Sequence, residues 1–116
     1  VNVRVGREHL KRVIVNLVKN AIQSVDDDKT AIIAITVIEE MGKATLSVKD
    51  NGKGIADEVK PKLFTPNFTT KSSGTGLGLA ICKNLIEAYN GTIWFESEVD
   101  RGSTFYIELP SVTTKE

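Results

Sequence analysis

The spacing of apolar residues predicts a chain that switches between strand and helix. Residues 1–5, "VNVRV", alternate apolar and polar positions, as in a short half-buried strand. Between residues 10 and 25 the apolar positions instead recur every three or four residues, which is the period of an amphipathic helix. The polar run "DDDKT" at residues 26–30 ends this helix in a turn.

Two pairs of strands are predicted further along. Residues 31–40 and 43–50 read as strands around the sequence "EEMGK", a hairpin with Gly42 in its turn. Residues 92–98 and 103–110 form a second pair, joined by the turn "VDRG". Both pairs are rich in residues that favour strands.

The segment between the strand pairs combines loops with helices. Residues 50–64 read as a glycine-containing loop followed by a short helix. Residues 65–76 are rich in Ser, Thr and Gly, which is typical of a loop. A second helix is predicted over residues 77–89, and Asn90-Gly91 supplies its left-handed stop.

Together these elements predict an α+β fold, a two-layer α/β sandwich with a mixed sheet and its helices on one face. The 116 residues suit one domain, and because the chain begins at Val1 without a methionine, we expect residues 1–116 to be a piece of a longer protein. Apolar residues make up 41% and charged residues 26%, as in an ordinary globular domain.

Charge and cysteine content exclude several classes of function. The 15 basic and 15 acidic side chains cancel, which argues against a general electrostatic grip on nucleic acid or an anionic membrane. Cys82 is alone, so neither a disulfide framework nor a metal-binding cysteine pair is expected, and a reducing, cytoplasmic setting fits best. The adjacent carboxylates at 26–28 point apart and predict a solvated turn.

Three glycines crowd the start of the second helix, in "GTGLGLAI". Gly74, Gly76 and Gly78 would let a ligand approach the backbone where free N–H groups favour a phosphate, and Lys71 lies just upstream. The alternative is a flexible hinge. The G-x-G-x-G spacing matches neither a P-loop, nor a Rossmann fingerprint, nor a protein-kinase loop.

Polar residues on the first helix and after the second strand of the first pair are also candidates. Asn16, Asn20 and Gln23 share one flank of the helix, and a neutral amide oxygen suits Mg²⁺, although such amides also satisfy nearby strands. Asp50 ends a strand before "NGKG", where a carboxylate could accept a hydrogen bond from the adenine amine. Alternatively, "DNG" is a simple turn signature.

In this order the motifs resemble one family. "NLVKNAIQ" is similar to its N box, "DNGKGI" to the G1 box, "LFTPNFTTK" to the F box and "GTGLGLAI" to the G2 box. These are the motifs of GHKL ATPases, in the form found in the catalytic, ATP-binding domain of sensor histidine kinases. The lid most resembles kinases related to the nitrogen-regulation sensors, and the resemblance runs from about Leu10 to Pro110.

The resemblance implies a Bergerat-type fold and roles for individual residues. It assigns Mg²⁺ to Asn20 with support from Asn16, and the adenine amine to Asp50. It places Phe64 and Phe68 at the ATP lid. The remaining implied nucleotide contacts are Gly52, Gly54, Ile55, Thr70, Lys71, Gly74, Thr75, Gly76, Leu77, Gly78, Leu79 and Thr104.

The resemblance also implies an activity, in which Mg-ATP donates its γ-phosphate to a histidine on a separate dimerisation domain of the parent protein. Asn20 and Lys71 would be the catalytic residues, and a response regulator receiver domain the later partner. The fragment would bind nucleotide without autophosphorylation, because His9 falls at a variable position and is expected to be a surface residue. The parent is expected to be a membrane-anchored sensor with this part in the cytoplasm.

Three alternatives remain open at this point. An anti-sigma-type serine kinase would share the ATP site. A chaperone- or topoisomerase-like ATPase would need a glutamate near Asn16, and none lies between Asn16 and Val25. A nucleotide-binding regulatory module would have lost phosphotransfer.

Overall fold

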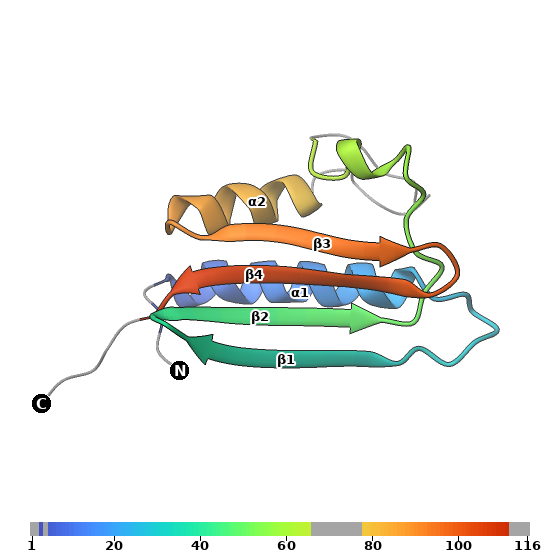
Figure 1. Cartoon of the computed structure of the whole chain (residues 1–116), viewed down its shortest axis with the longest axis horizontal. Coiled ribbons are helices and arrows are strands. Elements are labelled where there is room, and N and C mark those ends of the chain that lie inside the picture. Colours follow the sequence, from blue (N-terminus) through green and yellow to red (C-terminus); the bar gives the residue numbers. More distant parts are fainter. Residues whose placement is uncertain (1–2, 4, 66–77, 112–116) are drawn as a thin grey trace, which may run out of the picture.

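The computed structural model describes residues 3, 5–65 and 78–111. Along the chain the elements are α1 (Arg7–Gln23), β1 (Ile33–Glu40), β2 (Lys43–Asp50), a 3-10 turn η1 (Lys60–Lys62), α2 (Gly78–Ala88), β3 (Thr92–Glu98) and β4 (Gly102–Pro110). Figure 1 shows this arrangement. The predicted order of helices and strands is therefore confirmed.

The four strands form one sheet in the order β1-β2-β4-β3, and every pairing is antiparallel. We expected a mixed sheet, and for these strands that detail was wrong. The two strands of each hairpin are antiparallel because a short turn reverses the chain, and the pair β2–β4 that joins the hairpins is antiparallel as well. The strand predicted at residues 1–5 is represented by a single bridge between Val3 and Ser111, with positions 1, 2 and 4 outside the described residues.

The hairpin turn between β1 and β2 forms as its sequence predicts. Met41 has a φ of 52° and Gly42 a φ of 79°, both in the left-handed region. Two successive residues with positive φ match the twist of a tight antiparallel hairpin.

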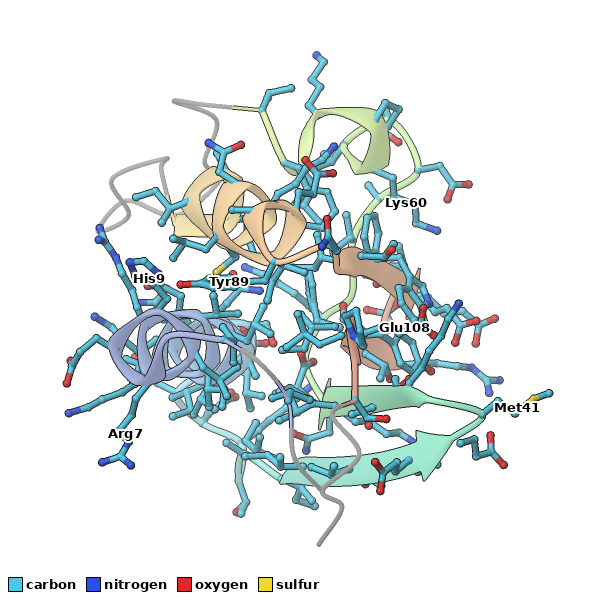
Figure 2. All side chains as sticks on the ribbon, turned by 90° about the vertical axis from the view of Figure 1, so that its left-hand side faces the viewer. Arg7, His9, Met41, Lys60, Tyr89 and Glu108 are labelled. Carbon is cyan, nitrogen blue, oxygen red and sulfur yellow. The ribbon has the colours of Figure 1, made fainter. Side chains whose placement is uncertain are left out.

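Helices cover one face of the sheet, which confirms the two-layer architecture. Strand residues alternate between a buried face toward the helices and an outer face, as the period of two requires. Figure 2 shows the two layers edge-on, with both helices on the same side. The buried cluster between the layers consists of Val13, Leu17, Ala21, Val48, Cys82, Ile86, Ile93, Phe105, Ile107 and Leu109.

The outer face of the sheet carries an aromatic pair. Trp94 stacks on Tyr106, its partner in the β3–β4 register, with ring centroids 5.1 Å apart and planes 10° from parallel. Trp94 therefore lies on the face opposite the helices. The Tyr106 hydroxyl donates to Glu96 at 2.9 Å, and this hydrogen bond raises the pKa of Tyr106.

The helices are tied to each other at the end away from Asp50. Nδ1 of His9 on α1 lies 2.7 Å from the hydroxyl of Tyr89, which follows α2 (Figure 2). His9 is exposed, as expected. Asn90 stops α2 with a φ of 65°, and Gly91 donates its N–H to the carbonyl of Ile86 at 2.9 Å, as the Asn-Gly pair predicts.

Several element ends meet at the opposite edge of the molecule. β2 ends at Asp50, β3 ends at Glu98 and β4 begins at Gly102, and the cartoon shows the end of α1 on the same side (Figure 1). The N and G1 boxes fall on these ends, so the fold brings these two motifs together although they are far apart in sequence.

Candidate functional site

Asp50 has a buried carboxylate, and only one of its two oxygens has hydrogen-bond partners among the described residues. The residue as a whole is only 3% exposed. Oδ1 accepts hydrogen bonds from the backbone N–H groups of Gly52 at 2.8 Å and Ser103 at 3.2 Å. Oδ2 is buried and has no hydrogen-bond partner among the described residues. A buried acceptor left unpaired is costly, so Oδ2 is positioned to receive a donor from a ligand.

The loop after β2 is clamped between α1 and the β3–β4 turn. A Cβ on Gly52 would come within 2.6 Å of the carbonyl oxygen of Ser24, which also accepts the N–H of Lys53 at 3.1 Å. Gly54 has a φ of 77°, and a side chain there would collide with the carbonyl group of Glu98. Glycine is required at both positions because backbone segments touch.

The far end of this loop is held by a serine of β3. The N–H of Ile55 donates to the hydroxyl of Ser97 at 2.8 Å, and that hydroxyl lies 2.8 Å from the hydroxyl of Ser103. Lys60 donates to the carbonyl of Ser97 at 3.1 Å. Ile55, predicted to line the base pocket, is half-buried and packs against the core.

The side chain of Thr104 lies on the face of the sheet opposite to that of Asp50, and its predicted contact with the base stays a prediction. Thr104 pairs with Lys49 in the β2–β4 register, and directly paired residues share a face. Asp50 is the next residue along β2 and therefore points to the other face. The residue beside its carboxylate is Ser103, which is 5% exposed. Ser103 was not among the predicted site residues, and the alternation of β4 is the signal that could have found it.

Asn16 lies where α1 meets the beginning of α2. Its side-chain oxygen would be 3.8 Å from a Cβ on Gly78, so the two residues are neighbours. The thiol of Cys82, one turn further along α2, lies 3.8 Å from the carbonyl of Val13. Burial raises the pKa of this thiol to about 11, although a hydrogen bond with Asn16 opposes the rise. The structure thus brings together the N-box helix and the helix that follows the glycine-rich segment.

Asn20 follows Asn16 by one helical turn and lies on the same flank of α1. Both are half-buried, whereas Gln23 is exposed. Leu79, in the first turn of α2, is half-buried and packs against the core. These positions agree with a polar flank of α1 that faces the beginning of α2.

The predicted lid and most of the glycine-rich loop cannot be placed. Phe68, Thr70, Lys71, Gly74, Thr75, Gly76 and Leu77 lie outside the described residues. Phe64, just before them, packs on Phe95 with ring centroids 5.8 Å apart and on Phe105 at 6.4 Å. This aromatic contact packs the end of the described segment 5–65 against the core.

A pocket opens at the same end of the sheet, and Asp50, Ser97 and Ser103 form part of its lining. Its volume is about 520 Å³, and its lining includes residues of the outer face such as Lys49, Glu96 and Thr104. Charges of both signs line it, including those of Arg101 and Glu98. It lacks the mostly apolar walls that enclose small-molecule ligands.

Two further kinds of feature are absent from the described part of the chain. Within residues 3, 5–65 and 78–111, no group of three or more His, Cys, Asp or Glu side chains is arranged to hold a metal ion. Neither of the described helices has the length and apolar character needed to cross a membrane.

Comparison with known proteins places the site in a family. Residues 6–113 match the model of the histidine kinase-, DNA gyrase B-, and HSP90-like ATPases. The chain is 40% identical over 108 residues to sporulation kinase D of Bacillus subtilis (strain 168), covering 93% of this chain and 21% of that protein. It is 43% identical over 110 residues to the sensor histidine kinase ZraS of Escherichia coli (strain K12), covering 94% and 23%. The chain therefore spans about a fifth of the length of these relatives.

A solved structure agrees in both fold and sequence. The catalytic domain of histidine kinase ThkA superposes with a TM-score of 0.82 at 41% identity, over 94% of this chain and 70% of that chain. The four-stranded sheet with helices on one face is thus the architecture of a histidine kinase catalytic domain.

Proposed function

The chain belongs to the histidine kinase-, DNA gyrase B-, and HSP90-like ATPases, and on that premise we propose that it presents the γ-phosphate of Mg-ATP to a histidine on a separate dimerisation domain. It is the ATP-binding part of a histidine kinase, and ATP is its substrate. The acceptor domain belongs to the same parent protein in this proposal, and a response regulator receiver domain takes the phosphoryl group afterwards. The parent is a membrane-anchored sensor with this part on the cytoplasmic side.

The free oxygen of Asp50 is the observation that carries the proposal. Oδ2 is a buried acceptor without a partner among the described residues, beside a loop whose glycines pack directly against the backbone of Ser24 and Glu98. The N6 amine of adenine is a donor of the right kind for it, and Ile55 offers an apolar surface for the ring. In this proposal Oδ2 gains its partner when the base binds, while Oδ1 keeps the N–H groups of Gly52 and Ser103.

The phosphate side is assigned to the beginning of α2 and the polar flank of α1. Gly78 opens α2 beside Asn16, so the free N–H groups of the first helical turn lie near the amides of α1. In this proposal Asn20 ligates Mg²⁺, Asn16 orients the neighbouring groups, and Lys71 contacts the terminal phosphate. Mg²⁺, when bound, neutralises phosphate charge during transfer. An amide oxygen is a suitable donor for such a hard cation.

His9 is not the phosphoacceptor in this mechanism. It sits near the first residue of α1, eleven residues before Asn20, which corresponds to about 16 Å along a helix. Its ring is also held by the hydroxyl of Tyr89 at 2.7 Å. In this proposal the nucleophile comes from another part of the parent protein.

The base site is tested by titrating ATP into Asp50→Asn. The amide keeps the shape of the carboxylate and one acceptor for the N–H groups of Gly52 and Ser103, but it turns an N–H₂ donor toward the adenine amine. We expect ATP affinity to fall by about tenfold or more, because hydrogen bonds to charged groups are worth about 1.5–3 kcal/mol. Asp28→Asn, in the exposed turn after α1, is the control and should bind like wild type.

The metal and transfer roles need separate measurements. Asn20→Ala should weaken binding of ATP in Mg²⁺ buffer and have a smaller effect in EDTA. The chain by itself, incubated with γ-labelled ATP, should bind nucleotide and accumulate no phosphohistidine. Equal affinity of Asp50→Asn and wild type would refute the base site, and label on His9 would refute the separate acceptor.

A further inference from the structure

Ser97 joins three parts of the base site through one hydroxyl. Its Oγ accepts the N–H of Ile55 at 2.8 Å, lies 2.8 Å from the Oγ of Ser103, and is 3.2 Å from the carbonyl oxygen of Gly102. Ser97 and Ser103 are direct partners in the β3–β4 register, so their side chains share the face toward the helices. No role follows for Ser97 from the sequence motifs described above.

A serine hydroxyl has one proton to donate and two lone pairs to accept with. In Ser97 one lone pair takes the N–H of Ile55. The proton can go to the carbonyl of Gly102 or to the oxygen of Ser103, and the 2.8 Å distance to Ser103 is the typical length for two hydroxyls. When Ser97 donates to Ser103, the proton of Ser103 is free to point into the base site.

The resulting pair of groups complements adenine. Ser103 lies directly beside the carboxylate of Asp50, because its N–H donates to Oδ1 at 3.2 Å. If Ser97 donates to Ser103 rather than to the carbonyl of Gly102, the site offers an acceptor, Oδ2 of Asp50, and a donor, the hydroxyl of the adjacent Ser103. Adenine presents the N6 donor next to the N1 acceptor, and hypoxanthine presents the reverse, an O6 acceptor next to an N1–H donor. A site built to hydrogen-bond one pattern discriminates against the other.

We infer that Ser97 is a positioning residue that sets the preference for adenine over hypoxanthine by orienting the hydroxyl of Ser103. The inference rests on the proposed function, since it takes the base to lie against Asp50. Ser97 itself does not touch the base. It holds the loop at Ile55 and the hydroxyl of Ser103 in one arrangement, so both sides of the base site depend on it.

The test compares ATP and ITP binding by calorimetry for the wild-type chain and Ser97→Ala. We expect Ser97→Ala to weaken ATP binding by about two- to tenfold, the value of one hydrogen bond, and to weaken ITP binding less, so that the ATP/ITP affinity ratio falls at least twofold. Ser97→Thr keeps the hydroxyl and should restore the ratio. Ser47→Ala, the same substitution on the outer face of β2, should leave both affinities unchanged.

A double substitution separates positioning from general weakening. If Ser97 acts through Ser103, then Ser97→Ala in a Ser103→Ala background should not change the ATP/ITP ratio further. An equal loss of ATP and ITP affinity in Ser97→Ala, with the ratio unchanged, would overturn the inference. If the ratio is unchanged in Ser97→Ala while wild type binds ATP and Asp50→Asn binds it more weakly, only the role of Ser97 is refuted. If wild type does not bind ATP, the proposed function fails as well.

A measurement on the wild-type chain covers the case in which Ser97→Ala does not fold. An ATP analogue with carbon in place of N1 should bind about two- to tenfold more weakly than ATP, whereas an analogue with carbon in place of N7 should bind like ATP. Equal affinity for the two analogues would overturn the inference independently of any variant.

Discussion

Asp50 and Ser103 are the buried polar side chains among the described residues, and they lie in contact. Polar groups are buried at a cost unless they are paired, so their meeting at one place marks the site more clearly than either residue alone. Oδ1 of Asp50 accepts hydrogen bonds from the chain, whereas Oδ2 has no hydrogen-bond partner among the described residues. In the proposed function the same residue organises the loop and accepts the adenine amine.

Cys82 provides a prediction at this scale, because burial raises its pKa from the ordinary value of 9.0 to about 11. The unfolded chain loses this proton at lower pH than the folded chain does. Below pH 9 the thiol therefore has no effect on the pH dependence of stability. Between pH 9 and 11 it should lower the free energy of unfolding by about 2–3 kcal/mol as pH rises.

Urea unfolding of wild type and Cys82→Ala from pH 8 to 11 checks this expectation. Other groups titrate equally in both proteins, so the difference between them isolates the thiol. The stability of Cys82→Ala should approach that of wild type as pH rises through this range. A constant difference would contradict the prediction, and rapid alkylation of the folded chain at pH 8 would contradict the burial on which it depends.

At the scale of elements, the site depends on how the loop after β2 docks on α1. The carbonyl of Ser24, at the end of α1, accepts the N–H of Lys53, and Gly52 fits against it without a side chain. Asn51 binds the segment before β1 by accepting the N–H of Ile32 at 2.8 Å and donating to the carbonyl of Thr30 at 3.0 Å. The loop is therefore held on several sides before any ligand binds.

Gly52→Ala should destabilise the chain, because the new methyl group would lie within 2.6 Å of the carbonyl oxygen of Ser24. We expect a loss of about 1–3 kcal/mol in the free energy of unfolding, together with weaker ATP binding as the loop shifts. Gly42→Asn is the control, because its turn has open space and asparagine tolerates a φ of 79°. Chemical denaturation measures both. Equal stability of Gly52→Ala and wild type would show that the loop is not clamped.

At the scale of the whole molecule, β1 is an edge strand that the helices leave largely uncovered. Figure 1 shows it at the margin of the sheet, beyond the layer formed by α1 and α2. Ile35 is 52% exposed and Val37 is 50% exposed on the face that would otherwise meet a helix, and Ile22 of α1 is 51% exposed. An apolar edge strand of this kind is a template for pairing with another chain.

We therefore expect copies of this chain to associate through β1 as concentration rises. Ile35→Lys places a charge on the edge and should shift the chain toward monomer in sedimentation velocity. Val99→Lys, an equally exposed position in the β3–β4 turn, should leave the association unchanged. A wild-type chain that stays monomeric over the whole concentration series would contradict this prediction.

Local patterns determined most of the architecture. The helical period of α1, the alternation of the strands and the turn residues at Gly42 and Asn90 act over a few neighbours, so each was predictable from the sequence. The position of Asp50 at a strand end was predictable for the same reason. The family motifs identified an ATPase of the histidine kinase type, which the comparisons confirmed.

Tertiary structure decided what the local pattern could not. Whether the sheet is mixed or antiparallel depends on which strands meet, and the described strands proved to be antiparallel throughout. A shift of one residue along β4 exchanges the two faces of the sheet, so only the register shows that Ser103, and not Thr104, lies beside Asp50. The contact between Ser97 and Ile55 joins residues 42 positions apart, and no local pattern encodes such a contact. The sequence determined the elements and the family, and the packing of distant strands determined which hydroxyls reach the base site.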